Sequence, residues 1–461
     1  MHTTRTIISQ TPDLIGKSVT LKGWVHSKRN MGKIVFIDLR DAFGLLQVVF
    51  AGNEELQNQA DQLKPESVIE LTGTIAERNA KNVNDKIATG GIELQAETLN
   101  VLNESETPPF EINRENVEDE ELRLKYRYLD IRHDRLHQNL KMRHQVFNKL
   151  RNLLDAKHFV EVETPLLTAP TPEGARDFLV PSRKAPGSFY ALPQSPQQYK
   201  QLLMAAGIER YYQIAKCMRD EDSRGDRQPE FTQLDMEMSF VDREEVIQFN
   251  EQLMIDLIES TYPDKKIQTK PFPRMTYKEA MDKYGSDRPD LREDKNDPNL
   301  LAFCWIIDFP MFEKTDDGWT FSHNPFSAPM PEHMDDLLAG NNVENIIAAQ
   351  YDLILNGFEL GGGSIRNHQP EALKATLRIM GYDDTKAKAD FGHMMTAFTY
   401  GTPPHGGIAF GLDRFVMILQ NEPNIREVIA FPKTDSGRDP MMESPRAVDN
   451  ATLAELGLKT K

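Results

Sequence analysis

Two different patterns of apolar and polar positions divide the chain. Up to about residue 104, short stretches alternate between apolar and polar residues, as strands with one buried face do. These stretches are SVTLKGWVHS, KIVFIDLRD, LLQVVFA, SVIELTGTIAER and IELQAETLNVLN, broken by the turn-forming segments AFG, GNEE and ATGG. One helix-like interruption, NEELQNQADQL, follows the third strand. This arrangement predicts an all-β domain over residues 1–104.

Five short strands suit a small Greek-key barrel, and the five-stranded OB-fold, which binds oligonucleotides on an open face, is the natural candidate. The alternation in KIVFIDLRD places Phe36 on the strand face opposite Val35 and Ile37. If Phe36 is exposed beside Arg29 and Gln47, it is a platform on which a base can stack, with cations nearby for phosphate. The alternative is that Phe36 belongs to the core.

The pattern changes after residue 104. Residues 105–130 open with two prolines and continue as a charged, partly helical segment, which predicts a linker. Residues 131–461 then alternate strand-like and helical pieces, beginning with a long amphipathic helix, RLHQNLKMRHQVFNKLRNLLDAKHF. The strand-like pieces are FVEVETPLL, DFLVPS, RYYQIAKCMRDE, FTQLDMEMSF, CWIIDFPMF, GFELGGGSIR and GIAFGLDRFVMIL. We therefore expect an α+β domain built on an antiparallel sheet flanked by helices.

One strand of this sheet carries an unusual polar face. In QLDMEM, carboxylates alternate with apolar residues, so Asp235 and Glu237 share one face while Leu234, Met236 and Met238 share the other. Such a strand indicates a sheet with one face packed on the core and one face turned toward a ligand.

Composition and charge narrow the class of protein. The chain has 461 residues with 39% hydrophobic and 27% charged residues, enough for two or three domains with real cores. No apolar run is long enough for a membrane span, and the two cysteines, Cys217 and Cys304, are far apart, which suits a reducing cytoplasm. The net charge of −17 alone speaks against nucleic-acid binding. Residues 17–40, however, hold six Lys and Arg residues against one Asp, which is either a local phosphate footprint or a solvated strand face.

Arginines and carboxylates on the predicted strands indicate nucleotide chemistry without the common glycine-rich motifs. Neither a P-loop nor a dinucleotide-binding fingerprint is present. Arg219, Arg366 and Arg414 lie within or just after apolar strands, where an arginine is costly unless it meets an anion. The alternative for each is an internal ion pair. The carboxylates on similar strands favour a site for polyphosphate and a metal ion; they are Glu221, Asp235, Glu237, Asp352 and Glu359. The glycines of GGGS at 361–364 mark either a tight turn or a close approach of backbone to ligand.

Several of these stretches together resemble a known family. FVEVETPLLTAPTPEGARDF (159–178), the segment AKCMRDEDSRGDRQPEFTQLDMEMSF (215–240) and GIAFGLDRFVMIL (407–419) resemble motifs 1, 2 and 3 of class II aminoacyl-tRNA synthetases. QSPQQYKQLLM, FSHNPFS, GFELGGGSIR and YGTPPHGGIAFGLDR are similar to aspartyl-tRNA synthetases of the bacterial type, which belong to subclass b. The resemblance covers nearly the whole chain. One departure is large: the extra domain that bacterial members usually carry between motifs 2 and 3 is missing.

The resemblance implies an ATP site and its chemistry. Arg219 and Arg414 would be the catalytic residues, Arg219 on the α-phosphate and on the substrate carboxylate, Arg414 on the γ-phosphate and against adenine. Phe231 would stack on the other adenine face, and Glu221 would read its exocyclic amine. The remaining expected ATP contacts are Gln228, Glu359, Gly411, Leu412 and Asp413. Asp352 and Glu359 would coordinate Mg²⁺.

The resemblance also implies a pocket for aspartate. Arg366 and Lys200 would clamp the side-chain carboxylate, and a protonated His323 would add charge. The remaining expected contacts, with the ammonium group, are Glu173, Ser195, Gln197 and Asp235. Asparagine lacks the charge and would leave the two cations unpaired, so the clamp favours aspartate.

The predicted partner is tRNA-Asp, bound by both domains of a cytoplasmic homodimer. The barrel would read the anticodon through stacking on Phe36 and polar contacts, and the expected polar residues are Arg29, Gln47, Arg78 and Glu93. Arg224 would touch the acceptor end, and Pro165 in motif 1 indicates a homodimer interface.

Three alternatives stay open at this point. Family members that also charge tRNA-Asn tend to carry His at the position of Met31 and a small residue at that of Lys81, so this chain leans toward tRNA-Asp alone. An amide-forming relative would lack the anticodon barrel. A tRNA-binding module with a dead active site would lack the arginines and carboxylates that this chain retains.

Overall fold

The computed structural model describes residues 5–114, 119–170, 174–316 and 318–459. The chain forms two compact units, Met1–Asp134 and Arg135–Lys461, each with a hydrophobic core of its own. None of the helices in the described part of the chain has the length and apolar content needed to span a bilayer.

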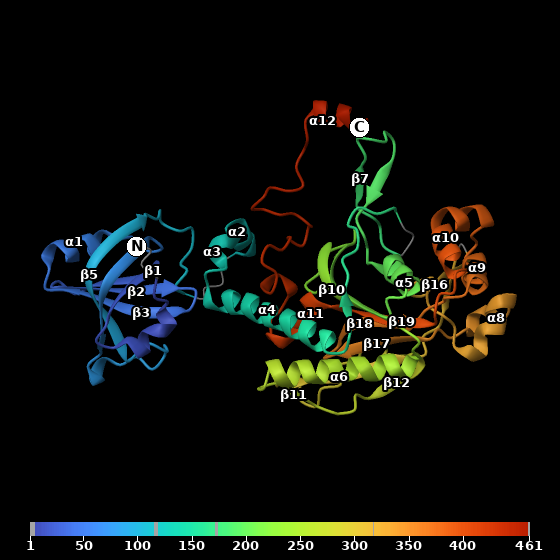
Figure 1. Ribbon diagram of the computed structural model, residues 1–461, viewed down its shortest axis with the longest axis horizontal. Coiled ribbons are helices and arrows are strands. Elements are labelled where there is room, and N and C mark those ends of the chain that lie inside the picture. Colours follow the sequence, from blue (N-terminus) through green and yellow to red (C-terminus); the bar gives the residue numbers. More distant parts are fainter. Residues whose placement is uncertain (1–4, 115–118, 171–173, 317, 460–461) are drawn as a thin grey trace. The chain divides into compact units, whose positions relative to one another are not determined.

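The first unit is built on a closed barrel of five strands in the order β1-β2-β3-β5-β4 (Figure 1). All neighbouring pairs are antiparallel except β3 and β5, which are parallel. The strands are β1 (Ser18–Asn30), β2 (Ile34–Asp41), β3 (Gly44–Ala51), β4 (Val68–Glu77) and β5 (Ile92–Asn103). The helices of this unit are η1 (Ile8–Leu14), α1 (Glu54–Gln62), η2 (Ala80–Asn82), α2 (Glu120–Lys125) and α3 (Arg127–Asp130). The five predicted strands and the helix after the third are thus confirmed.

The alternation along β2 separates its two faces as predicted. Val35, Ile37 and Leu39 are buried in the barrel core, whereas Phe36 is only half-buried on the outer face. The alternative that placed Phe36 in the core is wrong.

An ionic cluster holds the helical segment that follows the barrel. Arg123 and Arg127 each donate a hydrogen bond to the buried carboxylate of Asp130, at 3.1 and 2.6 Å. Burial alone would raise the pKa of Asp130, but its bonds to His133 and Arg123 and the charge of Arg127 lower that pKa to about 2. The first compact unit extends through this segment to Asp134.

The second unit is built on an eight-stranded sheet in the order β12-β14-β17-β18-β19-β10-β9-β6. The sheet strands are β6 (Val160–Glu161), β9 (Arg210–Met218), β10 (Glu230–Ser239), β12 (Arg274–Thr276), β14 (Phe303–Ile307), β17 (Gln350–Leu355), β18 (Phe358–Ile365) and β19 (His405–Gly411). Within the described residues, three small two-stranded sheets accompany it: β7 (Leu179–Pro181) with β8 (Phe189–Ala191), β11 (Lys266–Ile267) with β13 (Leu300–Leu301), and β15 (Phe312–Thr315) with β16 (Gly318–Phe321).

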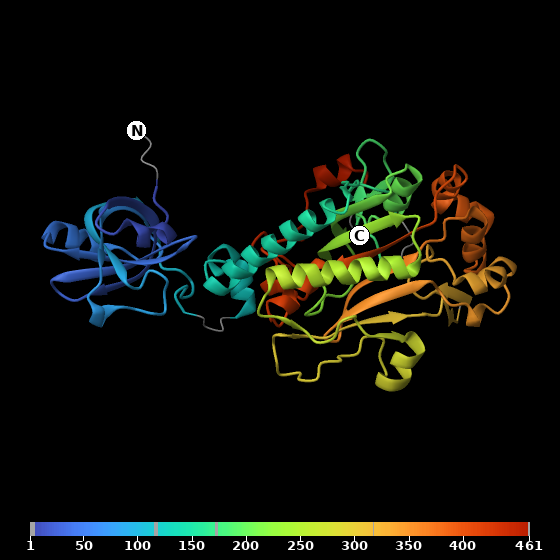
Figure 2. The same ribbon diagram turned by 60° about the horizontal axis from the view of Figure 1, so that its bottom comes forward.

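One face of this sheet packs on helices to form the main core. The apolar side chains of β10, Leu234, Met236 and Met238, join residues of α4, α6 and α11 in it, and Figure 2 shows α6 lying along the sheet. The helices of the unit are α4 (Asp134–Asp155), α5 (Gln197–Ala205), α6 (Arg243–Thr261), α7 (Tyr277–Tyr284), η3 (Pro331–His333), α8 (Met334–Ala339), η4 (Val343–Asn345), α9 (Pro370–Ile379), α10 (Asp384–Phe398), α11 (Leu412–Leu419), η5 (Ile425–Glu427) and α12 (Asn450–Glu455).

The structure refines the predicted antiparallel sheet in two ways. The six central strands are antiparallel, but β12 pairs with β14 and β6 pairs with β9 in the parallel sense. GIAFGLDRFVMIL is strand only in its first half, because Leu412–Leu419 forms α11. Arg414 therefore lies in the first turn of a helix and not within a strand.

Candidate active site

The polar face of the large sheet forms the floor of a cavity of about 630 Å³. β10 contributes Asp235 to this floor, as the alternation in QLDMEM predicted, and β18 contributes Gly362. The cavity also contains most of the residues assigned to aspartate and the metal ion: Ser195, Gln197, Lys200, Arg219, His323, Asp352, Glu359 and Arg366. Glu173, the remaining residue assigned to aspartate, lies outside the described residues.

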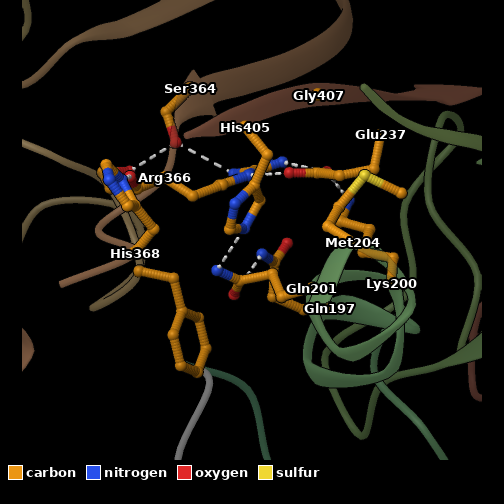
Figure 3. Close-up of polar contacts among 12 residues, drawn as sticks. Gln197, Lys200, Gln201, Met204, Glu237, Ser364, Arg366, His368, His405 and Gly407 are labelled. Atoms are coloured by element: carbon orange, nitrogen blue, oxygen red, sulfur yellow. Dashed lines mark hydrogen bonds and ion pairs between the residues drawn. The ribbon is translucent and has the colours of Figure 1, made fainter. Parts of the chain in front are cut away.

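Four buried charges meet here: Lys200, Asp235 and Arg366 line the cavity, and Glu237 pairs with the two cations without lining it. The guanidinium of Arg366 donates from Nε and Nη2 to the two carboxylate oxygens of Glu237, at 2.9 and 3.1 Å, and from Nη1 to Ser364 Oγ at 2.9 Å (Figure 3). Lys200 Nζ donates to Asp235 Oδ1 at 2.5 Å and lies 3.4 Å from Glu237 Oε2. All four side chains are at most 3% exposed, so each charge depends on its partners.

The sequence placed Glu237 among the carboxylates of a polyphosphate and metal site, whereas the structure pairs it with Arg366 and Lys200. Its pKa would rise through burial, but the charges of Arg366 and Lys200 lower it, so the carboxylate is ionised. The same pairing raises the pKa of Arg366 against the effect of burial. Glu237 therefore orients the two predicted clamp residues. The alternating pattern placed it on the polar face, but its pairing with Arg366 joins distant parts of the chain.

Asp235 offers an unsatisfied acceptor to the cavity. Its Oδ2 atom is buried without a hydrogen-bond partner, although Oδ1 is paired with Lys200. Burial raises the pKa of this carboxyl, opposed by Lys200. A buried acceptor without a partner is costly, and a cationic group of a ligand would satisfy it.

A second pair of carboxylates stands on β17 and β18. Burial and the nearby charge of Glu359 raise the pKa of Asp352 well above its ordinary value. No group of three or more metal-ligating side chains exists among the described residues. Two carboxylates are nonetheless a fitting donor set for Mg²⁺, which takes one or two carboxylates and completes its shell with water and phosphate oxygens.

The glycine triplet lies inside the central strand β18, so the tight turn considered for it is wrong. A Cβ on Gly361 would meet Ala409 O at 2.6 Å, and a Cβ on Gly363 would meet Gly407 O at 2.1 Å. A Cβ on Gly362 would meet the Asp352 carboxylate at 2.7 Å, inside the cavity. The glycines are required for close packing of strands and for the space beside Asp352.

An adjoining cavity of about 190 Å³ contains the aromatic and arginine residues assigned to ATP. The guanidinium of Arg219 lies over the ring of Phe231, 5.1 Å from its centre. Arg414 donates to Asp226 Oδ2 at 2.9 Å and to the carbonyl of Glu359, while its buried Nε has no partner. Arg219, Glu221 and Glu359 line both cavities. The two cavities therefore form one continuous site.

Three of the expected ATP contacts have structural duties. Gln228 exchanges two hydrogen bonds with the backbone of Lys433, at 2.5 and 2.9 Å. Asp413 accepts from Thr232 N at 2.7 Å and pairs with Arg143 at 2.6 Å, which ties α11 to β10 and α4. Both residues still line the smaller cavity, as does Gly411. Leu412 is fully buried in the core and lines neither cavity, so its side chain cannot contact a ligand there.

His323 differs from the expectation of an added positive charge. Its ring packs edge-on against Phe309, with ring centres 5.0 Å apart, and burial lowers its pKa despite the nearby Glu359. His323 is therefore neutral near pH 7.

The segment between β9 and β10 forms an exposed loop beside the cavities. Arg224 lies in it and is exposed, and its backbone pairs with that of Arg227. The loop is thus held as a tight hairpin whose tip faces solvent.

The residues assigned to the anticodon form one continuous patch on the barrel. Arg29 Nη2 donates to Gln47 Oε1 at 3.3 Å, Gln47 donates to Glu93 at 2.9 Å, and Arg78 lies 4.0 Å from Glu93. The Arg29 guanidinium also lies 5.8 Å from the centre of the Phe36 ring. The structure therefore brings together residues from β1, β2, β3 and β5 with Arg78, which follows β4.

Two family models match the chain. Residues 119–435 match the family described as tRNA synthetases class II (D, K and N), and residues 19–102 match the OB-fold nucleic acid binding domain. The second match confirms the OB-fold predicted from the five strands.

Similar curated proteins match over nearly the whole chain. The aspartate–tRNA(Asp/Asn) ligase of Natranaerobius thermophilus is 41% identical over 578 aligned positions, covering 98% of each chain. The aspartate–tRNA ligase of Staphylococcus carnosus is 39% identical, also with 98% of each chain covered, and that of Listeria monocytogenes is 41% identical over 97% of this chain and 96% of its own. The alignments are much longer than the 461 residues of this chain, consistent with an insertion that it lacks.

Solved structures share the fold at low identity. The asparaginyl-tRNA synthetase of Pyrococcus horikoshii with asparaginyl-adenylate has a TM-score of 0.76 at 23% identity, covering 93% of this chain and 98% of its own. The aspartyl-tRNA synthetase of Entamoeba histolytica has a TM-score of 0.73 at 22% identity, covering 93% of this chain and 91% of its own. These likenesses support the two-domain architecture.

Proposed function

The chain belongs to the aspartate–tRNA ligases among the class II tRNA synthetases, and we propose that it activates L-aspartate with ATP and transfers it to tRNA-Asp. The observation that carries the choice of amino acid is the buried set of Arg366, Lys200 and Asp235 in the cavity, with Glu237 paired to both cations. The cavity presents Arg366 and Lys200 to a ligand carboxylate, and the unpartnered Oδ2 of Asp235 to a ligand ammonium group.

Aspartate fits the charges of the pocket. Arg366 and Lys200 bind its side-chain carboxylate, with Glu237 holding both cations in place. The unpartnered Oδ2 of Asp235 accepts from the ammonium group, together with Gln197, Ser195 and Glu173. Neutral His323 lies beside the substrate as a hydrogen-bonding group. Asparagine would offer Arg366 and Lys200 a neutral amide in place of a carboxylate, which weakens its binding relative to that of aspartate.

ATP occupies the adjoining cavity in this proposal. Phe231 and Arg414 hold the two faces of adenine, and Glu221 accepts from its amine, while Gln228, Gly411 and Asp413 also line the site. Arg219 stands at the junction of the two cavities, where the aspartate α-carboxylate attacks the α-phosphate, forming aspartyl-adenylate and releasing pyrophosphate. Its charge stabilises the negative charge that builds up in the transition state. Asp352 and Glu359 would hold Mg²⁺, which supplies charge neutralisation for the phosphates.

The tRNA meets both units of the chain. Its anticodon bases stack on Phe36 and contact Arg29, Gln47, Arg78 and Glu93, which already lie in one patch. Its acceptor end is contacted by the exposed Arg224. Aromatic stacking contributes about 1–3 kcal/mol per base in such complexes.

The active form proposed is a cytoplasmic homodimer joined through motif 1. Val160, Leu166 and Leu167, around Pro165, are about half exposed. Large apolar side chains gathered on one exposed segment are typical of a protein interface, and a second copy of the chain covers them in this proposal. Sedimentation of the intact chain at micromolar concentration should give twice the monomer mass, and a monomer would contradict the dimer.

Two assays test the function. In the presence of Mg²⁺, aspartate should support exchange between ATP and pyrophosphate, and asparagine should not. No exchange with aspartate at any Mg²⁺ concentration would refute the proposed enzymatic activity. Charging of purified tRNA-Asp and tRNA-Asn side by side should favour tRNA-Asp. Equal charging would instead establish the alternative, a ligase for both tRNAs, which is the activity that the Natranaerobius relative is named for.

A further inference from the structure

A chain of hydrogen bonds runs from Gln197, at the start of α5, to His405, at the start of β19 (Figure 3). His405 Nδ1 lies 2.8 Å from the carbonyl oxygen of Pro403, and His405 Nε2 lies 3.1 Å from Gln201 Nε2. Gln201 Oε1 accepts from Gln197 Nε2 at 3.1 Å. His405 and Gln201 are fully buried, whereas Gln197 lines the cavity. Neither His405 nor Gln201 has a role in the proposed reaction.

The chemistry of the groups gives this chain one direction. A carbonyl oxygen only accepts, so His405 Nδ1 must carry its proton toward Pro403. In a neutral imidazole the other nitrogen is then an acceptor, and the amide nitrogen of Gln201 donates to it. The carbonyl oxygen of Gln201 consequently faces Gln197, whose amide nitrogen donates. The carbonyl oxygen of Gln197 is the amide atom that this chain does not use.

The surroundings of His405 keep its imidazole neutral. The ring is fully buried beside Phe398 and His368, with ring centres 6.4 and 6.3 Å away. Burial lowers the pKa of His405. The charges of Arg366 and His368 lower it further, whereas the charge of Glu237 raises it. A protonated His405 would donate from Nε2 and would need the carbonyl oxygen of Gln201 as its acceptor. The Gln201 amide would have to rotate by half a turn, and the amide of Gln197 would have to rotate with it.

We infer that His405 is a positioning residue that acts through Gln201 to turn the carbonyl oxygen of Gln197 toward the ammonium group of aspartate, an inference that rests on the proposed aspartate site. An ammonium group only donates hydrogen bonds, so the opposite orientation of Gln197 would present it with an N–H group. Two buried residues that do not touch the ligand, Gln201 and His405, thereby fix the orientation of an acceptor in the pocket. The arrangement selects for the amino group of the substrate independently of the carboxylate clamp.

The test compares aspartate with succinate, which keeps both carboxylates but lacks the ammonium group. In the intact chain, His405→Leu removes the acceptor for Gln201, and Gln201→Met removes the middle of the chain in case the first variant does not fold. Each should raise the KM for aspartate in pyrophosphate exchange about tenfold, the cost of one lost hydrogen bond to a charged group. The inhibition constant of succinate should change less than about twofold, since succinate makes no ammonium contact.

Two further variants sharpen the result. His405→Gln offers an amide oxygen near the position of Nε2 and should recover most of the affinity for aspartate. His393→Leu is the matched control, because His393 also bonds a glutamine of α5, Gln198, at 2.6 Å, but neither residue lines the cavity; its KM should not change.

Two outcomes would overturn the inference. One is a parallel loss of aspartate and succinate binding, which would mean that His405 only supports the fold around Arg366, whose backbone N–H donates to the carbonyl of residue 405. The other is an unchanged KM for aspartate in folded variants. Absence of aspartate-dependent exchange in the unaltered chain is distinguishable from both and would overturn the proposed function as well.

Discussion

Arg366 in the catalytic cavity and Arg29 in the barrel patch are the same kind of side chain in opposite environments. In the cavity, the Arg366 side chain is 3% exposed and makes two hydrogen bonds to Glu237 at about 3 Å. On the barrel, the Arg29 side chain is 57% exposed and reaches Asp38 and Gln47 at 3.4 and 3.3 Å. Buried charges admit one arrangement because any unpaired member is costly, whereas exposed charges are screened and can rearrange. One region is thus suited to a small ligand of fixed charge, and the other to RNA.

The largest effect is expected from breaking the buried cluster. Arg366→Leu removes the partner of Glu237 and the main anchor of the aspartate carboxylate. Truncating one partner of a buried, hydrogen-bonded charge pair costs about 2–5 kcal/mol of binding free energy, so aspartate-dependent exchange should fall roughly 10²–10³-fold while ATP still binds. Arg274→Leu, which removes a partly exposed arginine paired with Glu244, is the control and should stay near full activity. Substantial aspartate turnover by Arg366→Leu would refute the clamp.

A somewhat smaller effect is expected at the carboxylate pair. Asp352→Asn keeps the shape of the side chain but removes one of the two charges proposed for Mg²⁺. Because loss of even an outer-shell partner costs roughly 10–100-fold in metal affinity, the Mg²⁺ concentration for half-maximal exchange should rise at least tenfold. Chelation of Mg²⁺ should abolish exchange in the unaltered chain. If Asp352→Asn responds to Mg²⁺ like the unaltered chain, the metal lies elsewhere.

The barrel patch should respond more modestly and only in the tRNA step. Phe36→Ala removes one stacking surface, which contributes about 1–3 kcal/mol per base, so the KM for tRNA-Asp should rise about tenfold. Pyrophosphate exchange should be unaffected. Phe43→Ala, at an exposed phenylalanine outside the patch, is the matched control and should change the KM little. A fall in pyrophosphate exchange with Phe36→Ala would contradict the claim that the barrel patch acts only in the tRNA step.

The smallest effect is expected at Met31 and Lys81, the positions at which relatives that also charge tRNA-Asn tend to carry other residues. Met31 is 74% exposed, and Lys81 is exposed as well, so neither is required by the core. Met31→His combined with Lys81→Ala should raise the charging of tRNA-Asn relative to tRNA-Asp a few-fold, since exposed contacts are worth about 1 kcal/mol or less. A variant that charges tRNA-Asn no better would place discrimination at other residues.

Local patterns in the sequence were sufficient to predict the faces of individual strands. The alternation in KIVFIDLRD and QLDMEM correctly separated Phe36 from the barrel core and Asp235 from the sheet core. Local patterns could not show that Arg366 would be paired with Glu237, because the two are far apart in sequence and meet only when β10 and β18 lie on either side of β19. For the same reason, local patterns could not show that β12 and β6 pair with their neighbours in the parallel sense. The helical turn at Arg414 escaped because a short apolar run fits both strand and helix.

The central claim is that the buried cluster selects aspartate for attachment to the tRNA that the barrel binds. The most direct measurement is the aminoacylation of purified tRNA-Asp by the intact chain with ATP, Mg²⁺ and either labelled aspartate or labelled asparagine. We predict that aspartate is esterified to the tRNA and that asparagine is not. Attachment of asparagine, or no attachment of aspartate by a folded preparation, would contradict the account.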